Sequence, residues 1–273
     1  MKLPIFQVDA FTSHAFGGNP AAVVLLDAWL PDDVMQSIAA ENNLAETAFI
    51  VAPESAADPI PLRWFTPAIE VDLCGHATLA AGHVLFRHRD PLVDTLHFST
   101  SSGILSVTRR GGLFELDLPA RPGKPTEVTD ALVAALGARP SETLAARDLL
   151  AVFASAADVR ALKPDFVAVA ALDTFAVIAT APGDEADVDF VSRFFAPRAG
   201  VNEDPVTGSA HCTLVPYWAA RLGRHRLVAR QVSRRGGELT CELRGSRVGV
   251  AGRAVEYLSG TIDVPSPHTG ERP

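Results

Sequence analysis

The chain has 273 residues, of which 48% are hydrophobic and 21% charged, so it can bury the core of one large domain or two ordinary ones. Its formal net charge of −8 argues against a polyanionic partner, and no cluster of Lys and Arg with interleaved aromatic residues indicates a nucleic-acid surface. No apolar stretch reaches the roughly 18 residues that a membrane-spanning helix needs, so we expect no membrane segment.

The first half of the chain consists mainly of short β-branched segments separated by Gly, Pro or Asp, which predict strands. Residues 1–11 alternate like a strand and lack the apolar core of a signal peptide, which favours a cytoplasmic protein. Apolar residues at helical spacing predict helices over 31–42 and 75–86. The predicted strands of this half span residues 3–8, 21–26, 47–51, 62–65, 96–99, 104–109 and 114–118.

The second half continues the same pattern of strands with few helices, which predicts an α+β fold with mostly antiparallel strands. The polar, proline-rich end at residues 264–273 is expected to fray. The predicted strands span residues 149–153, 166–170, 175–180, 227–231, 239–243, 247–250 and 255–262. The predicted helices span residues 129–136, 156–162, 188–195 and 208–222.

An internal repeat links the two halves. Residues 63–67 read RWFTP and residues 193–197 read RFFAP, both of the form R-x-F-x-P. Each motif precedes a glycine that opens an apolar helix, Gly75 in the first half and Gly208 in the second, 208 − 75 = 133 positions later. The repeat predicts two similar domains, each a strongly curved sheet around one buried helix.

The stretch RPGKPTEVTD at residues 121–130 has the proline and charge content of a linker. We therefore predict one domain over residues 1–120 and a second over 121–273, and we allow the last strand to pack on the first domain.

The two helix starts are candidate anion sites. Glycine lets a ligand approach the backbone, and the N–H groups of a first helical turn favour anions. We expect Gly75 and Gly208 to face each other across an interdomain cleft and to hold a carboxylate; close helix–sheet packing is the alternative. His76 and Ser209 follow the two glycines, so we expect His76 to hydrogen-bond or carry a proton and Ser209 to donate.

Cysteines offer a second chemistry. Cys74 precedes Gly75, and a helix start favours a thiolate. Cys-x-His is too close in sequence for an evident nucleophile–base pair, however, and a zinc site needs further ligands at sensible spacing, so we predict no metal. Three distant cysteines without a CxxC motif indicate reduced thiols.

Two carboxylates complete the set of candidates. Glu46 lies between a predicted helix and an apolar strand, where partial desolvation suits a general base. Asp204 lies four residues before Gly208, after Glu203. The alternatives are that Glu46 is a loop residue, Asp204 a turn former beside its proline, and Glu203 a solvated charge.

Four stretches together resemble the phenazine-biosynthesis isomerase-like (PhzF-like) family. The resemblance covers essentially the whole chain and implies the diaminopimelate epimerase fold, with two pseudo-symmetric halves, each a barrel-like sheet around a central helix. It further implies a homodimer and catalysis without a cofactor. The stretches are DAFTSHAFGGNPAAVV (9–24), NNLAETAFI (42–50), RWFTPAIEVDLCGHATLAAG (63–82) and EDPVTGSAHC (203–212).

The resemblance assigns roles to individual residues. It implies that Glu46 removes and returns a proton of a small carboxylate substrate, with His76 and Asp204 as further catalytic residues. It places substrate binding on the residues Gly75, Gly208, Ser209, Asn19 and Cys74.

Epimerases of this fold use two opposed cysteines, and here the chain departs from that pattern. Cys74 matches one of the pair, but Asp204-Pro205 and Ser209 stand where the second cysteine motif belongs, and Cys212 is expected to be a buried structural thiol. A thiol-dependent amino-acid racemase or epimerase is therefore one alternative function. A small-molecule-binding protein without turnover is another.

Overall fold

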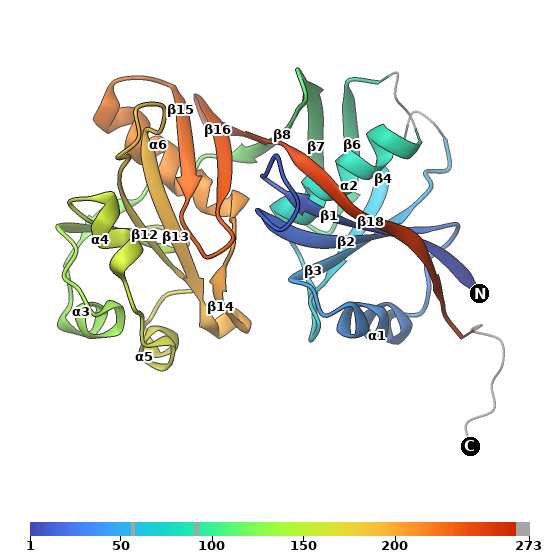
Figure 1. The fold of residues 1–273 in the computed structure, drawn as a ribbon, viewed down its shortest axis with the longest axis horizontal. Coiled ribbons are helices and arrows are strands. Elements are labelled where there is room, and N and C mark those ends of the chain that lie inside the picture. Colours follow the sequence, from blue (N-terminus) through green and yellow to red (C-terminus); the bar gives the residue numbers. More distant parts are fainter. Residues whose placement is uncertain (56–57, 90–92, 266–273) are drawn as a thin grey trace. The chain divides into compact units, whose positions relative to one another are not determined.

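The computed structural model describes residues 1–55, 58–89 and 93–265, and the chain divides into two compact units (Figure 1). The first unit comprises residues 1–15, 20–116 and the segment from 253 on; the second comprises residues 16–19 and 117–252. Most of the segment expected to fray lies outside the described residues. No helix within the described ranges combines the length and apolar character needed to cross a membrane.

The first unit is a mixed sheet packed against α2 (Gly75–His88), whose residues contact β1, β3, β7 and β18. β3 runs parallel to β2 and antiparallel to β4, and β6 runs parallel to β4. β18, from the end of the chain, pairs antiparallel with β1. The strands are β1 (Lys2–Ala10), β2 (Asn19–Leu26), β3 (Glu46–Val51), β4 (Ile60–Phe65), β5 (Glu70–Val71), β6 (Thr95–Thr100), β7 (Gly103–Arg110), β8 (Leu113–Pro119) and β18 (Ala254–Asp263).

The second unit repeats this topology around α6 (His211–Leu222), which packs on β15, β16 and β17. β12 runs parallel to β11 and antiparallel to β13, and β15 runs parallel to β13. The strands are β9 (Lys124–Thr126), β10 (Glu142–Ala145), β11 (Leu149–Val152), β12 (Val177–Pro182), β13 (Phe190–Ala196), β14 (Val201–Asp204), β15 (Arg226–Gln231), β16 (Gly237–Arg244) and β17 (Arg247–Gly252).

Both central helices are buried because their side chains are apolar over most of the helix surface. Gly82 in α2 shows how closely the sheet approaches, since a Cβ at that position would lie 2.7 Å from Cγ1 of Val107. The predicted α+β fold, with two pseudo-symmetric units each built around one helix, is confirmed. The other helices are α1 (Asp32–Asn42), α3 (Asp130–Leu136), α4 (Ala156–Ala161), α5 (Phe166–Ala171), and the 3₁₀ turns η1 (Pro197–Ala199) and η2 (Gly208–Ala210).

Two predicted elements have the wrong type. Residues 166–170 form helix α5, because the Asp165 side chain accepts hydrogen bonds from the amides of Val167 and Ala168 and caps a helix. Residues 190–196 form β13 rather than a helix, because this segment pairs with both β12 and β15 and is apolar on both faces. Sequence analysis also missed β5, β9, β10 and β14, each of two to four residues.

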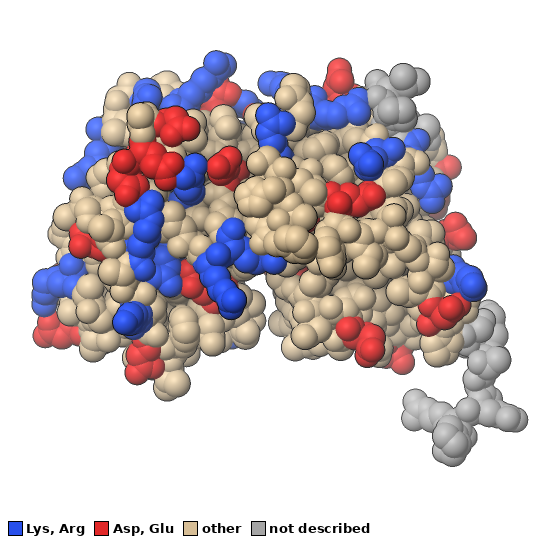
Figure 2. Space-filling model, viewed as in Figure 1, with Lys and Arg blue, Asp and Glu red and all other residues tan. Residues whose placement is uncertain are grey.

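Charged side chains of both signs are interspersed on the visible face of each unit (Figure 2). Local ion pairs account for part of this pattern: Arg230, for example, pairs with Glu185 and Glu238 in the second unit. Exposed pairs of this kind each contribute little to stability.

Candidate active site

Three predicted residues meet in the first unit. Glu46 is the first residue of β3, Cys74 immediately precedes α2, and His76 is the second residue of α2. His76 Nε2 lies 3.0 Å from Glu46 Oε2, and His76 Nδ1 lies 3.6 Å from Cys74 Sγ. The imidazole therefore lies between a carboxylate and a thiol, and both of its nitrogens have a polar neighbour.

The start of α2 lies directly after Cys74. Cys74 has an extended backbone (φ −142°, ψ 110°), and no side chain caps the helix. The Thr78 amide bonds to the Cys74 carbonyl and thereby closes the first turn. The N-terminal end of a helix carries a partial positive charge, so this end of α2 favours an anion or a developing negative charge.

Burial and neighbouring groups set the protonation of the cluster. Burial, followed by the Glu46 carboxylate, raises the pKa of the Cys74 thiol to about 11, so the helix start does not make it a thiolate at neutral pH. Burial lowers the pKa of His76, but the Cys74 sulfur and the Glu46 carboxylate outweigh burial and hold this pKa well above its ordinary value. Both neighbours of the ring favour its protonated form, the Cys74 sulfur first and the Glu46 carboxylate second.

The second unit brings together Asn19 and Asp204. The Asn19 side chain is fully buried and donates to Asp204 Oδ1 at 2.7 Å and to the Val206 carbonyl at 2.9 Å. The Thr207 hydroxyl donates to Asp204 Oδ2 at 2.5 Å. The carboxylate of Asp204 thus accepts hydrogen bonds on both oxygens within its own unit.

Gln231 is a buried residue that contacts this loop and that the sequence patterns did not indicate. Its amide nitrogen donates to the Asp204 carbonyl at 2.7 Å, and its amide oxygen accepts from the Thr207 backbone at 2.8 Å. It is the last residue of β15, and the signal that could have indicated it was an amide side chain on the inward-facing side of a strand whose residues alternate between exposed and buried. Gln231 holds the loop that leads into Gly208.

The helix start in the second unit differs from the prediction in its first turn. Residues 208–210 form the 3₁₀ turn η2, and α6 begins only at His211. Gly208 is buried and Ser209 half-buried. His211 donates from Nδ1 to the Thr207 carbonyl at 2.9 Å, and burial lowers the pKa of His211 to about 4.

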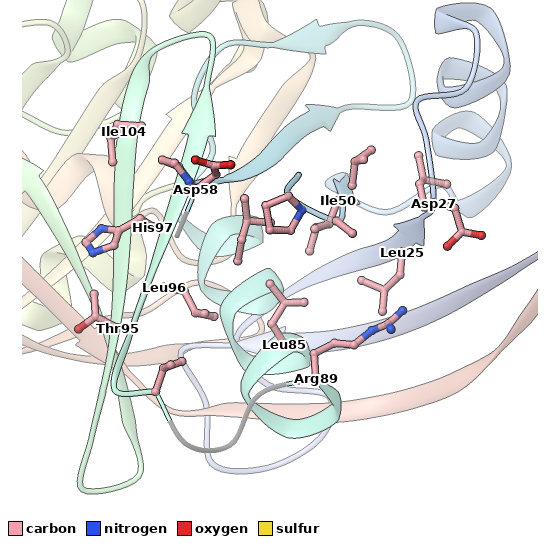
Figure 3. A pocket seen from close by; sticks show the side chains of 17 residues that line it. Leu25, Asp27, Ile50, Asp58, Leu85, Arg89, Thr95, Leu96, His97 and Ile104 are labelled. Atoms are coloured by element: carbon pink, nitrogen blue, oxygen red, sulfur yellow. The ribbon is translucent and has the colours of Figure 1, made fainter. Parts of the chain in front are cut away.

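A cavity of about 470 Å³ lies elsewhere in the first unit (Figure 3). Leu25, Ile50, Leu85 and Leu96 lie around it, and Arg89 contributes a charge. Leu85 is ten residues beyond the start of α2, which at ~1.5 Å per residue puts the cavity about 15 Å along the helix from Gly75. Neither Glu46 nor His76 lines this cavity.

Known proteins match this chain over most of its length. Residues 8–260 match the model of the family described as phenazine biosynthesis-like protein. An uncharacterized isomerase of Pseudomonas aeruginosa is 53% identical over 263 residues, which cover 96% of this chain and 99% of that protein.

Comparison with solved structures indicates the same family. A PhzF-family phenazine biosynthesis protein of Enterococcus faecalis has a TM-score of 0.93 and 47% identity, covering 97% of this chain and 100% of that chain. A hydroxyproline epimerase of Agrobacterium vitis has a TM-score of 0.61 at 11% identity, covering 97% and 94%. The likeness to the hydroxyproline epimerase shows a shared fold only.

Proposed function

Since the chain belongs to the phenazine biosynthesis-like family of isomerases, we propose that it isomerises a small carboxylate-bearing substrate by moving a proton, without a cofactor. The observation that supports this reaction is the contact between Glu46 and His76 beside the uncapped start of α2. A base, an acid and the partly positive start of a helix are three parts that suit proton transfer next to a carboxylate.

Glu46 is the proposed base. One of its carboxylate oxygens takes a proton from a substrate carbon, and the electron pair left on the substrate delocalises toward the adjacent carboxylate or double bond. Glu46 exchanges the proton with solvent and returns one to a different carbon, which completes the isomerisation with no net change in atoms or charge. The Glu46 side chain is 16% exposed, so it combines access to solvent-borne substrate with partial desolvation.

His76 is the proposed acid partner. As an imidazolium it forms an ion pair with Glu46 and can donate a proton to substrate oxygen or carbon as negative charge develops. The amides of the first turn of α2 add donors at fixed positions, which strengthens stabilisation of that charge because they need no reorganisation.

Asp204 stays a predicted catalytic residue, and Gly208 and Ser209 stay predicted substrate-binding residues. Asp204 already accepts two hydrogen bonds from its own unit, which suits a carboxylate held in one orientation. The expected homodimer and cytoplasmic location also stay predictions.

Deuterium exchange tests the proposal. The protein is incubated with candidate small carboxylates in deuterated water, and deuterium incorporation into the recovered carboxylate is followed by mass spectrometry. We expect exchange catalysed by the wild type and a loss of about 10²- to 10⁴-fold in Glu46→Gln, the usual range for removing a general base. Glu41→Gln is the matched control, since Glu41 is an exposed residue of α1 only five positions away.

Two results would count against the function. Exchange that survives in Glu46→Gln would remove Glu46 as base. Carboxylates that bind tightly without any exchange or isomerisation would instead support a binding protein without turnover.

A further inference from the structure

We propose that Glu46, Cys74 and His76 also form a binding site for a zinc ion that inhibits the enzyme. One ligand atom from each of these side chains lies within 4.8 Å of the other two. A thiol, an imidazole and a carboxylate are the three ligand types that zinc takes in proteins.

The distance between sulfur and nitrogen fits a zinc site. With ~2.3 Å for Zn–S and ~2.05 Å for Zn–N, a tetrahedral angle separates the two ligand atoms by ~3.6 Å. Cys74 Sγ and His76 Nδ1 are 3.6 Å apart without any metal-driven adjustment. Because the two residues are separated by one position at the start of a buried helix, this pair is held rigidly.

Glu46 supplies the third ligand from a different element. It lies 74 − 46 = 28 positions before Cys74 in sequence, which is why ligand spacing did not reveal the site. In the structure Glu46 Oε2 faces His76 Nε2 at 3.0 Å, whereas Cys74 Sγ faces Nδ1, so the Glu46 side chain must swing toward the Nδ1 side of the ring to reach the ~2.0–2.2 Å that a Zn–O bond requires. Three protein ligands leave a fourth position open to water or an anion.

The charge of the three side chains and the soft thiolate ligand both favour zinc over magnesium or calcium. Binding requires a thiolate and an unprotonated imidazole nitrogen, so protons leave as the ion enters. A thiolate and a carboxylate then balance the two positive charges of the ion, which avoids a net buried charge. Thiolate and imidazole ligands select zinc, whereas magnesium and calcium prefer sites made of oxygen ligands.

Inhibition is the consequence for the reaction, and this step rests on the proposed function. A zinc ion ligated by Glu46 and His76 occupies the proposed base and acid together. Zinc and turnover are therefore mutually exclusive at this cluster.

Direct binding measurements test the site without relying on activity. Zn²⁺ affinity is measured by calorimetry, and Co²⁺ serves as a spectroscopic probe because a cysteine ligand produces a sulfur-to-cobalt charge-transfer absorption band. We expect about one ion per chain, and we expect Cys74→Ala to lose the band and at least about 100-fold in Zn²⁺ affinity, and Glu46→Gln about tenfold. Cys212→Ala is the matched control: it removes a buried helical cysteine of the second unit and should leave both readouts unchanged.

The outcomes separate the two proposals. A charge-transfer band that persists in Cys74→Ala, or Zn²⁺ affinity equal in all variants whose circular dichroism matches the wild type, overturns the zinc site. Zn²⁺ binding lost in Cys74→Ala, in a protein that shows no exchange with any carboxylate, supports the site and counts against the proposed function. Deuterium exchange that Zn²⁺ suppresses in the wild type and in Cys212→Ala, with a midpoint that matches the Zn²⁺ affinity measured by calorimetry, supports both.

Discussion

The two R-x-F-x-P motifs build the same scaffold in both units. In the first, the Arg63 guanidinium lies over the Phe65 ring and bonds to both carboxylate oxygens of Glu70 at 2.7 and 2.6 Å. In the second, Arg193 lies over Phe195 and bonds to both oxygens of Glu203 at 2.7 and 2.9 Å. In each unit the arginine thus joins its own strand to the short strand that leads toward the central helix.

The chemistry at the matching positions differs. Arg63 lies opposite Phe49 in the β3–β4 pair, and Arg193 lies opposite Ala179 in the β12–β13 pair. The residue three positions before Phe49 is Glu46. The residue three positions before Ala179 is Ala176. The base has no counterpart in the second unit. The repeat therefore preserves the arginine–glutamate scaffold, whereas the proposed base Glu46 is replaced by Ala176 in the second unit.

The buried histidines near the two helix starts show the same contrast. His76 contacts a carboxylate and a thiol, which together hold its pKa well above the ordinary value. His211 has a backbone carbonyl as partner, and burial lowers its pKa to about 4. The raised pKa of His76 suits its proposed role as an acid, whereas the lowered pKa of His211 suits a neutral side chain in the core.

The sharpest test compares the residues that follow the two glycines. His76→Asn removes the acid partner of Glu46 and should lower the rate of deuterium exchange about 100-fold. Ser209→Ala removes at most one hydrogen bond to substrate and should lower the rate of deuterium exchange about fivefold. Equal losses in the two variants, measured under saturating substrate, would mean that the acid–base groups are not confined to the first unit.

The arginine scaffold should differ in its contribution to stability. Arg193 is 11% exposed and also donates to the carbonyls of Val159 and Leu162, so Arg193→Ala leaves a partly buried carboxylate uncompensated and should cost about 3 kcal/mol. Arg63 is 25% exposed, and Arg63→Ala should cost about 1 kcal/mol. Urea unfolding monitored by circular dichroism gives both values, and a larger cost for Arg63→Ala would contradict this ranking.

The pH dependence of stability tests the neutral state of His211. Its pKa is lowered by folding, so between pH 6.5 and about 4 the unfolded chain takes up a proton that the folded chain does not, and stability falls as pH falls. The loss is up to about 3 kcal/mol, complete near pH 4.

The variant that checks this effect is His211→Asn, whose amide can still donate to the Thr207 carbonyl but does not titrate. Urea midpoints of wild type and variant, compared at several pH values, should diverge below pH 6.5. Parallel curves would show that His211 does not contribute.

The smallest effect is expected at Cys74. Its pKa of about 11 leaves the thiol protonated at neutral pH, so Cys74→Ser should change the exchange rate by less than about threefold. An inactive Cys74→Ser variant beside an active Glu46→Gln variant would establish the thiol-dependent racemase instead.

Several features followed from sequence alone. Period-two and helical hydrophobic patterns indicated the strands and both central helices, because burial on one or both faces of an element is written into the spacing of its apolar residues. The repeat of R-x-F-x-P and a helix-opening glycine predicted two similar units. The segment at 190–196 was nevertheless assigned to a helix, because an apolar run buried on both faces has no alternation to reveal a strand.

Only the tertiary structure decided how the chemical groups combine. Glu46 and His76 are 30 positions apart in sequence, and they meet because β3 lies against α2. Gln231 reaches Asp204 from β15, and Ala176 is recognised as the counterpart of Glu46 through the strand ladder alone. Sequence spacing reports contacts within one helix or strand, whereas proton transfer and metal binding depend on side chains that separate strands and helices bring together.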